Sequence, residues 1–150
     1  LLGGSQERGL RPGTQDAALA AGFRVALSWA ERWAARQPVL KQLRDRLEAE
    51  LGRLGGEVNG QGPRVAHVSN LSFPGWRGAE LAAALDLEGL RVSSGSACSA
   101  GTSEPSAVIA AMLGSERAAG SVRFSLGELT RDEQVTRAIA MVSRVVTARS

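Results

Sequence analysis

The chain has 150 residues, of which 43% are hydrophobic and 22% charged, and its formal net charge at pH 7 is +3. This length and composition suit an ordinary globular fold, and no apolar run approaches the 20 or so residues that a membrane span needs. Because the arginines are dispersed and aromatic residues make up only 4% of the chain, the sequence lacks the clustered cations and stacking rings typical of nucleic-acid binding.

The first third of the chain predicts a glycine-rich loop followed by two helices. Residues 1–14 contain four glycines and one proline, which break any regular period. From Asp16 to about Arg36 apolar residues recur every three or four positions, which predicts a helix. Gln37-Pro38 is expected to interrupt it, since proline disfavours helix in the preceding residue. A leucine stripe from Leu40 to Leu54 predicts a second helix that ends at Gly55-Gly56.

The middle of the chain predicts two strands, a helix and a loop. Alternation over Val65–Phe73 indicates a strand, with Asn70 and Ser72 on the face opposite Ser69 and Leu71. A short helix is expected over Gly78–Leu87 and a short strand over Leu90–Val92. Residues 93–103 contain only small side chains, so this segment is predicted to be a loosely anchored loop.

The last third predicts a helix, a strand and a final helix. Glu104-Pro105 is expected to open a helix that runs to Leu113, with Thr102 or Ser103 as N-cap. Ser121–Leu126 reads as a strand, and Thr130–Glu133 has the capping-box form T-x-x-E ahead of the final helix. The order of elements predicts an α/β fold: a small, mostly antiparallel sheet of about three strands covered by helices.

Cys98 is the only cysteine, and His67 the only histidine. No internal disulfide is possible, a Cys/His zinc site is not expected, and we predict no metal site. A free cysteine is usually a buried apolar residue, but Cys98 is flanked by Ser, Gly and Ala. The alternative, an exposed thiol used as a nucleophile, fits these neighbours better. A reducing, cytoplasmic setting is the default expectation.

Three further residues, Arg123, Thr14 and His67, are candidates for a functional or a purely structural role. Arg123 interrupts an apolar strand, either as an arginine on the wet face of an edge strand or as a planar fork that grips a substrate carboxylate. Thr14 closes a glycine-rich loop just before a helix, a place suited to binding a phosphate, although such loops are also common as plain turns. His67 is interpreted as a partly buried, hydrogen-bonded strand residue.

Three motifs, in order, resemble those of the cysteine desulfurases of the class-V aminotransferase family. Residues 93–101, followed by Glu104-Pro105-Ser106, resemble the active-cysteine segment, in the subgroup with a long mobile loop. Residues 121–127 resemble the substrate-carboxylate strand. Residues 6–9 and 11–14 resemble the loop that closes over the cofactor phosphate of the neighbouring subunit.

The resemblance implies a homodimeric enzyme that uses pyridoxal 5′-phosphate (PLP) to convert L-cysteine to L-alanine. Its sulfur would pass as a persulfide to scaffold or carrier proteins for iron–sulfur cluster assembly or thiolation. Cys98 would be the catalytic thiolate, Arg123 would bind the substrate carboxylate and Thr14 the PLP phosphate. The fold would be the C-terminal small domain of fold-type I PLP enzymes (37–150, with the active-cysteine loop 93–103), preceded by a cofactor-loop segment and linking helix (1–36).

One departure from the family pattern is large. The family's Schiff-base lysine follows a histidine and precedes the glycine-rich loop, whereas Lys41, the only lysine here, follows Leu40 inside a predicted helix. We therefore expect a C-terminal portion or fragment that lacks the N-terminal cofactor domain and is inactive alone. Two other interpretations stay open: a non-catalytic module that accepts persulfide sulfur or docks a partner, and a related PLP lyase or aminotransferase.

Overall fold

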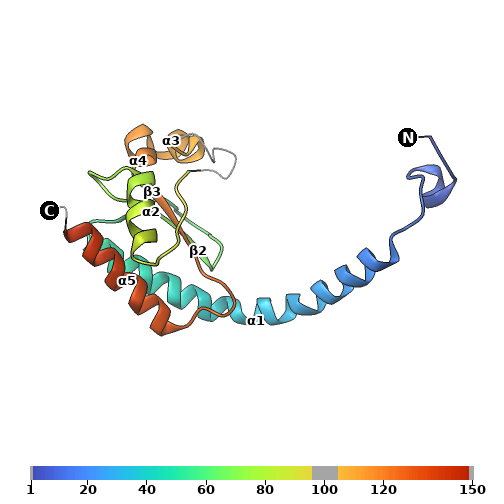
Figure 1. Ribbon diagram of the computed structural model, residues 1–150, viewed down its shortest axis with the longest axis horizontal. Helices are drawn as coiled ribbons and strands as arrows, with labels where there is room; N and C mark the ends of the chain where they lie inside the picture. The colour runs from blue at the N-terminus through green and yellow to red at the C-terminus, as the bar shows by residue number, and fades with distance from the viewer. Residues whose placement is uncertain (1, 96–104, 149–150) are drawn as a thin grey trace. The chain divides into compact units, whose positions relative to one another are not determined.

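The computed structural model describes residues 2–95 and 105–148 (Figure 1). The chain divides into two compact units, Leu1–Ala35 (unit 1) and Arg36–Ser150 (unit 2). None of the helices within the described residues combines the length and apolar character that a membrane crossing requires.

Unit 1 contains a short, irregular 3-10 turn, η1 (Gln6–Gly9), and the first half of helix α1 (Ala17–Arg53). The side chain of Asp16 caps α1, because its Oδ1 accepts a hydrogen bond from the backbone N–H of Leu19 at 2.8 Å. The helix in this unit carries exposed apolar side chains. They are Leu19, Phe23, Val25, Leu27 and Trp29.

The predicted break at Gln37-Pro38 is wrong, because α1 continues through Pro38 to Arg53. A proline inside a helix removes one hydrogen bond and costs about 3 kcal/mol. Leu40 and Leu51 lie on the following turns and are fully buried. Burial of leucine side chains is worth about 1.5–3 kcal/mol each, so packing outweighs the local cost of the proline.

Unit 2 is built around one antiparallel sheet of three strands, in the order β1 (Glu57–Val58), β2 (Val68–Ser72) and β3 (Ser121–Ser125). In the register of β2 and β3, Ser69 lies opposite Phe124 and Leu71 opposite Val122. These four side chains are buried, so one face of the sheet forms the core. The prediction of a small antiparallel sheet in an α/β fold is confirmed.

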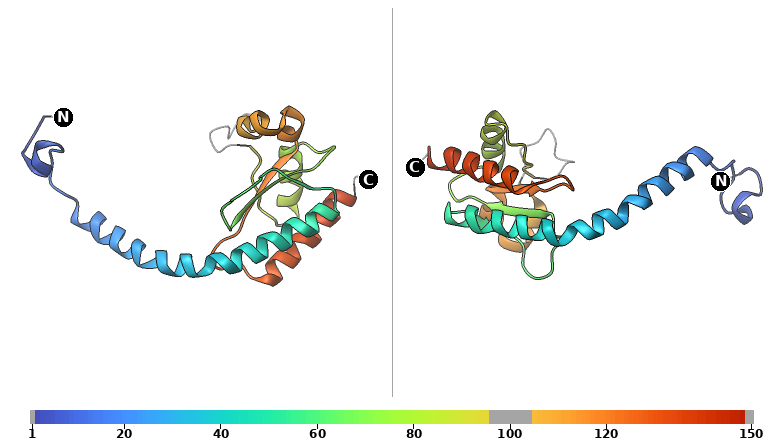
Figure 2. Two further views of the ribbon diagram at one scale, coloured as in Figure 1. Left: turned by 180° about the vertical axis from the view of Figure 1, so that it is seen from behind. Right: turned by 90° about the horizontal axis from the view of Figure 1, so that it is seen from below.

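Two helices lie side by side next to the sheet, the second half of α1 and α5 (Asp132–Thr147) (Figure 2). The guanidinium of Arg46 on α1 joins them, since its Nη2 donates to Thr136 Oγ1 at 2.7 Å and it pairs with Asp132. The α1 side chain Glu48 reaches the buried face of the sheet, where Ser69 Oγ donates to its Oε1 at 2.6 Å.

Helix α2 (Gly78–Leu87) has the predicted bounds, and its inward residues Leu81 and Leu85 are fully buried. It begins very close to β3, because a Cβ atom on Gly78 would lie 2.4 Å from the carbonyl oxygen of Ser121. Only glycine allows this approach, and it fixes the start of α2 against the sheet.

Three strand predictions need correction. β2 begins only at Val68, because the ladder with β3 starts at the Val68–Ser125 pair. β1 was not predicted, since two residues are too few to show alternation. No strand forms over Leu90–Val92; the segment makes a single bridge between Ser93 and Arg123 instead.

Two helix starts also differ from their predictions. Helix α3 (Ala107–Leu113) begins after Ser106, whose side chain accepts from the Ile109 N–H at 3.4 Å, so Pro105 precedes the helix. The predicted caps, Thr102 and Ser103, lie outside the described residues. The capping box predicted at Thr130–Glu133 is wrong by one residue, because Gln134 Oε1 accepts from the Arg131 N–H. The five-residue helix α4 (Ser115–Ala119) was not predicted.

Glu48 is the centre of a largely buried ionic cluster. Arg64 holds its two carboxylate oxygens at 2.7 and 3.0 Å, and the nearly buried Arg44 lies 3.8 Å away. Burial disfavours the charged carboxylate, but hydrogen bonds from Arg64 and Ser69 and the two positive charges outweigh it, so the pKa of Glu48 lies below its ordinary value.

The substitution Glu48→Gln is expected to lower the free energy of unfolding at pH 7 by about 2–4 kcal/mol, because it removes the largely buried carboxylate that accepts hydrogen bonds from Arg64 and Ser69. Since the pKa of Glu48 is lower in the folded state, this stabilisation is present above the unfolded-state pKa and disappears as the pH falls through the folded-state pKa. Urea unfolding followed by circular dichroism measures both effects. Glu50, which is half-buried and pairs with the exposed Arg53, provides the control Glu50→Gln, expected to change stability by less than about 1 kcal/mol.

Candidate functional site

Arg123 lies at the centre of β3 with an exposed side chain, between the buried Val122 and Phe124. Because side chains alternate along a strand, Arg123 projects from the sheet face opposite the core. The sequence left open whether this arginine is a plain edge residue or a ligand-binding group, so its neighbours on this face decide what it can do.

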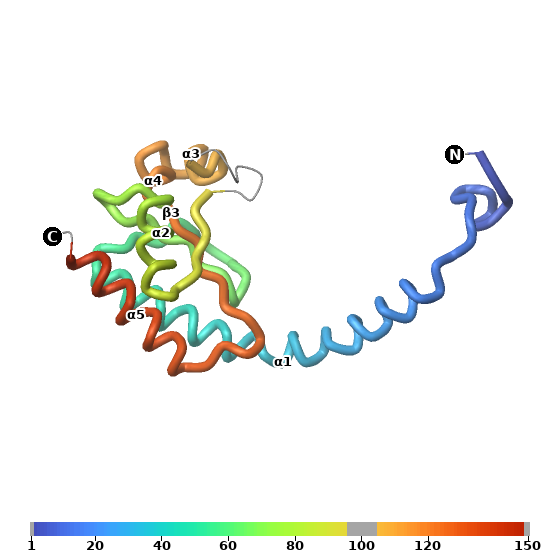
Figure 3. Tube along the Cα trace, in the orientation of Figure 1, coloured from blue at the N-terminus to red at the C-terminus, as the bar shows by residue number. Residues whose placement is uncertain are grey.

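Four polar residues lie side by side across this face, and we call them the polar row: Asn59, Asn70, Arg123 and Ser93. The Asn59 N–H donates to the Asn70 carbonyl at 2.9 Å, and Asn70 is the register partner of Arg123. Arg123 and Ser93 exchange two backbone hydrogen bonds, of 3.1 and 2.7 Å. The row therefore crosses β2 and β3 and ends on the segment that follows α2, which is the yellow part of the trace in Figure 3.

Side-chain hydrogen bonds fix both ends of the polar row. At one end, Arg123 Nη2 donates to Ser93 Oγ at 3.2 Å. At the other, the buried Asn59 donates through Nδ2 to Asn70 Oδ1 at 2.6 Å. Helix α4 anchors this end, since Arg117 Nε donates to Asn59 Oδ1 at 3.0 Å. The guanidinium of Arg123 is thus held on a built polar surface, with further N–H groups available to a ligand.

Cys98 lies outside the described residues, as does most of the predicted active-cysteine loop. Its place in the sequence is informative nonetheless, because Ser93, the partner of Arg123, precedes it by five residues. Chain geometry limits the distance between the Cα atoms of Ser93 and Cys98 to roughly 18 Å.

Thr14 belongs to unit 1, where it is exposed on the turn between η1 and α1. The turn is shaped by its own side chains: Gln6 Oε1 accepts from the Gly13 N–H at 3.2 Å, and Arg11 Nη1 donates to the Gly13 carbonyl at 2.9 Å. The hydroxyl of Thr14 makes no hydrogen bond within the described part of the chain. Arg123 belongs to unit 2. The surroundings of Thr14 and of Arg123 are therefore described separately, each within its own unit.

Lys41 does not provide the lysine that PLP requires. It is the only lysine of the chain, it is exposed on α1, and its Nζ lies 2.6 Å from Asp45 Oδ2. The hydrogen bond from Lys41, aided by the charge of Arg44, holds the pKa of Asp45 below its ordinary value despite partial burial. Judged by its donor groups, this chain alone does not fit PLP.

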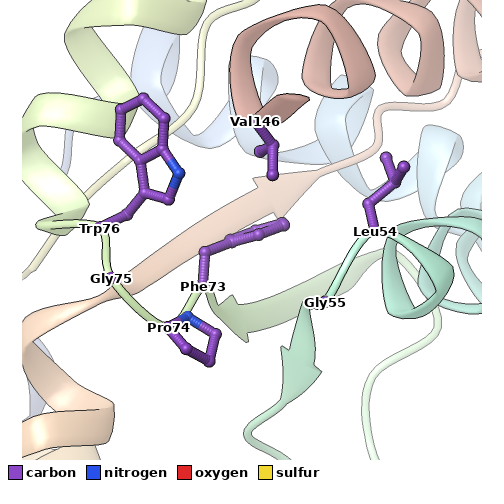
Figure 4. A pocket seen from close by; sticks show the side chains of 7 residues that line it. All are labelled: Leu54, Gly55, Phe73, Pro74, Gly75, Trp76 and Val146. Carbon is purple, nitrogen blue, oxygen red and sulfur yellow. The ribbon is translucent and has the colours of Figure 1, made fainter. Parts of the chain in front are cut away.

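A pocket of about 340 Å³ lies elsewhere in unit 2, where the end of α1, the turn after β2 and the end of α5 meet (Figure 4). Phe73 and Trp76 present their rings to it, and Val146 and Leu54 face them. No member of the polar row lines it, so this apolar pocket is not the candidate site.

Two predictions are left, the surroundings of His67 and the absence of a metal site. His67 is half-buried, and its carbonyl accepts from the Leu126 N–H at 2.8 Å. Within residues 2–95 and 105–148, no group of three or more His, Cys, Asp or Glu side chains is placed to hold a metal ion.

Sequence reasoning identified Arg123 but not its three partners in the polar row. A weak signal existed for Asn70, a polar residue inside a strand on the face opposite Leu71. Nothing in the sequence pairs Ser93 or Asn59 with these strands, because register between distant segments comes from tertiary structure.

The amino-acid sequence matches a family profile and several curated proteins. The aminotransferase class-V profile matches residues 4–138. The chain is 38% identical to a cysteine desulfurase of Bradyrhizobium diazoefficiens over 98% of its own length and 38% of that protein. It is 36% identical to the cysteine desulfurase NifS of Azotobacter vinelandii, over 97% of its own length and 38% of that protein.

Solved structures agree in fold. A NifS-like protein superposes with a TM-score of 0.75 at 25% identity, covering 99% of this chain and 38% of that one. A NifS-like protein from Rickettsia africae superposes with a TM-score of 0.76 at 22% identity, covering 98% and 39%. The chain therefore spans under two fifths of the length of the proteins it resembles, and its fold is that of part of a fold-type I PLP enzyme.

Proposed function

The chain belongs to the aminotransferase class-V family, and from this premise we propose that it is the C-terminal part of a PLP-dependent cysteine desulfurase. The whole enzyme converts L-cysteine to L-alanine and holds the sulfur on Cys98. Relatives named cysteine desulfurases support the proposal. The observation that carries it is the position of Arg123, an exposed guanidinium bonded to Ser93 where the Cys98 segment begins.

Arg123 binds the substrate carboxylate in this proposal. Its planar fork can give two parallel N–H donors to one carboxylate, and the hydrogen bond to Ser93 orients the guanidinium while other N–H groups stay available. The backbone bridge between Arg123 and Ser93 further couples the carboxylate site to the start of the Cys98 segment.

Cys98 accepts the sulfur. Its thiolate forms an S–S bond to the substrate sulfur while the carbon–sulfur bond of the substrate breaks. The electron pair of that bond stays on the carbon skeleton, which takes up a proton and leaves as L-alanine. The net reaction converts an enzyme thiol and L-cysteine to an enzyme persulfide and L-alanine, with the sulfur oxidised and the carbon reduced. The thiolate is the nucleophilic form of cysteine.

PLP would supply an electron sink for the amino-acid substrate, and in this proposal it would be held by a lysine outside this chain. Residues 1–36 contribute the cofactor loop and linking helix, with Thr14 as a hydroxyl donor to the PLP phosphate across a homodimer interface. Residues 37–150 form the C-terminal small domain with the active-cysteine loop 93–103. The partners are therefore the N-terminal cofactor domain, a second copy of the enzyme and a cytoplasmic sulfur-acceptor protein for iron–sulfur cluster assembly or thiolation.

A second candidate function is a module that accepts persulfide sulfur on Cys98 without PLP. It is motivated by the place of Lys41, the only lysine of the chain, which is exposed on α1 and paired with Asp45. In this case sulfur reaches Cys98 from a persulfide donor rather than from L-cysteine.

One experiment separates the two candidates. The chain is joined to, or co-expressed with, the lysine-bearing part of a class-V enzyme, loaded with PLP and given L-cysteine. We expect L-alanine and sulfide in the presence of a thiol reductant. If no alanine forms, although the isolated chain takes up sulfur from a persulfide donor, the desulfurase proposal is wrong and the acceptor module is favoured.

A further inference from the structure

We propose that Asn70 is a second carboxylate-binding residue, which acts with Arg123 as a two-donor clamp. The inference rests on the proposed function and adds a specificity-determining residue to its substrate site. It follows from the polar row, in which Asn70 and Arg123 are direct neighbours on adjacent strands. The Cβ atoms of such a pair are about 5 Å apart, so a carboxylate can contact both side chains.

The orientation of the Asn70 amide follows from a chain of hydrogen bonds that starts at Arg117. An arginine can only donate, so the Asn59 atom that faces Arg117 Nε at 3.0 Å is the oxygen. The nitrogen of Asn59 must then face Asn70 and Ser72, at 2.6 and 2.7 Å. Since Asn59 donates, the Asn70 atom that receives this bond is its oxygen.

The Asn70 nitrogen is consequently the side-chain atom that Asn59 does not occupy. Within the part of the chain that the structure describes, Asn70 Nδ2 donates to no acceptor, although Asn70 is half-buried. A partly exposed amide N–H group without a protein acceptor is available to a ligand oxygen. A ligand oxygen between Asn70 and Arg123 can accept from both side chains.

The two ends of the row differ from its middle. Asn59 bonds to Asn70 and Arg123 bonds to Ser93 through side chains, whereas no side-chain hydrogen bond between the register partners Asn70 and Arg123 is found in the described part of the chain. An amide donor beside a guanidinium favours an anion with two oxygens, such as a carboxylate, over a cation.

The test uses Asn70→Asp in the whole enzyme. Aspartate keeps the oxygen that accepts from Asn59 and replaces only the donor with a negative oxygen. We expect the KM for L-cysteine and the inhibition constant of the product L-alanine to rise together by roughly 10- to 100-fold, with a smaller change in kcat. Asn70→Ser, whose hydroxyl can also accept a hydrogen bond, is expected to raise both constants by roughly tenfold.

The control Gln61→Glu makes the same change in net charge at an exposed residue of unit 2 outside the polar row, and is expected to raise both constants less than threefold. The inference is wrong if folded Asn70→Asp and Asn70→Ser enzymes keep the KM and inhibition constant of the control. A wild-type enzyme that forms no alanine refutes the proposed function instead, so the two failures are distinct.

Discussion

Replacing Cys98 with alanine in the PLP-loaded whole enzyme is expected to lower the rate of alanine formation from L-cysteine by roughly 100-fold or more. Loss of a covalent nucleophile removes a step that no neighbouring hydroxyl can supply at neutral pH, because serine and threonine are far weaker nucleophiles than a thiolate. Cys98 is the only cysteine of the chain, so no second thiol in it can replace the first.

The matched control is Ser99→Ala, which changes the adjacent residue and leaves the thiol in place. It is expected to retain at least about half of the wild-type rate, as a substitution outside the reacting groups. Alanine formation at the wild-type rate by the Cys98→Ala enzyme contradicts the assignment of Cys98 as sulfur acceptor, whatever the control shows.

The second large effect is expected at Arg123. Arg123→Gln should lower kcat/KM for L-cysteine by about 100-fold, chiefly through KM, because it removes a charge-assisted, two-donor contact with the carboxylate. Arg123→Lys keeps the charge but loses the planar fork, so we expect an intermediate loss of about tenfold. Steady-state kinetics at saturating PLP measures both variants.

Arg137→Gln is the control for Arg123, since it removes an exposed arginine from α5 with the same change in net charge. It should leave KM within about twofold of wild type, because surface charges outside the site contribute little. If Arg123→Gln and Arg137→Gln have the same KM, Arg123 does not bind the substrate.

Local sequence patterns predicted the bounds of one helix and the two faces of one strand correctly. The apolar spacing of Gly78–Leu87 gave the bounds of α2 correctly, and alternation correctly placed Asn70 and Ser72 on one face of β2. Pro38 was misjudged because the burial of Leu40 and Leu51 comes from packing against other elements, which local propensity does not include.

The candidate site was only partly predictable. Arg123 is recognisable from the sequence as a charged residue in an apolar strand. Its role as part of a polar surface depends on its neighbours Asn59, Asn70 and Ser93. These residues lie 30 to 64 positions away in the sequence, and a one-residue change of register would move any of them to the other face of the sheet. Such contacts require the tertiary structure.

The most direct test of the proposed function is mass spectrometry of the peptide that contains Cys98. The peptide is taken from the PLP-loaded whole enzyme after incubation with L-cysteine in the absence of a reductant. We expect one added sulfur atom on Cys98, in step with the first equivalent of L-alanine, and its loss when a thiol reductant is added. Formation of alanine while the Cys98 peptide keeps its unmodified mass would contradict the central claim that Cys98 holds the sulfur.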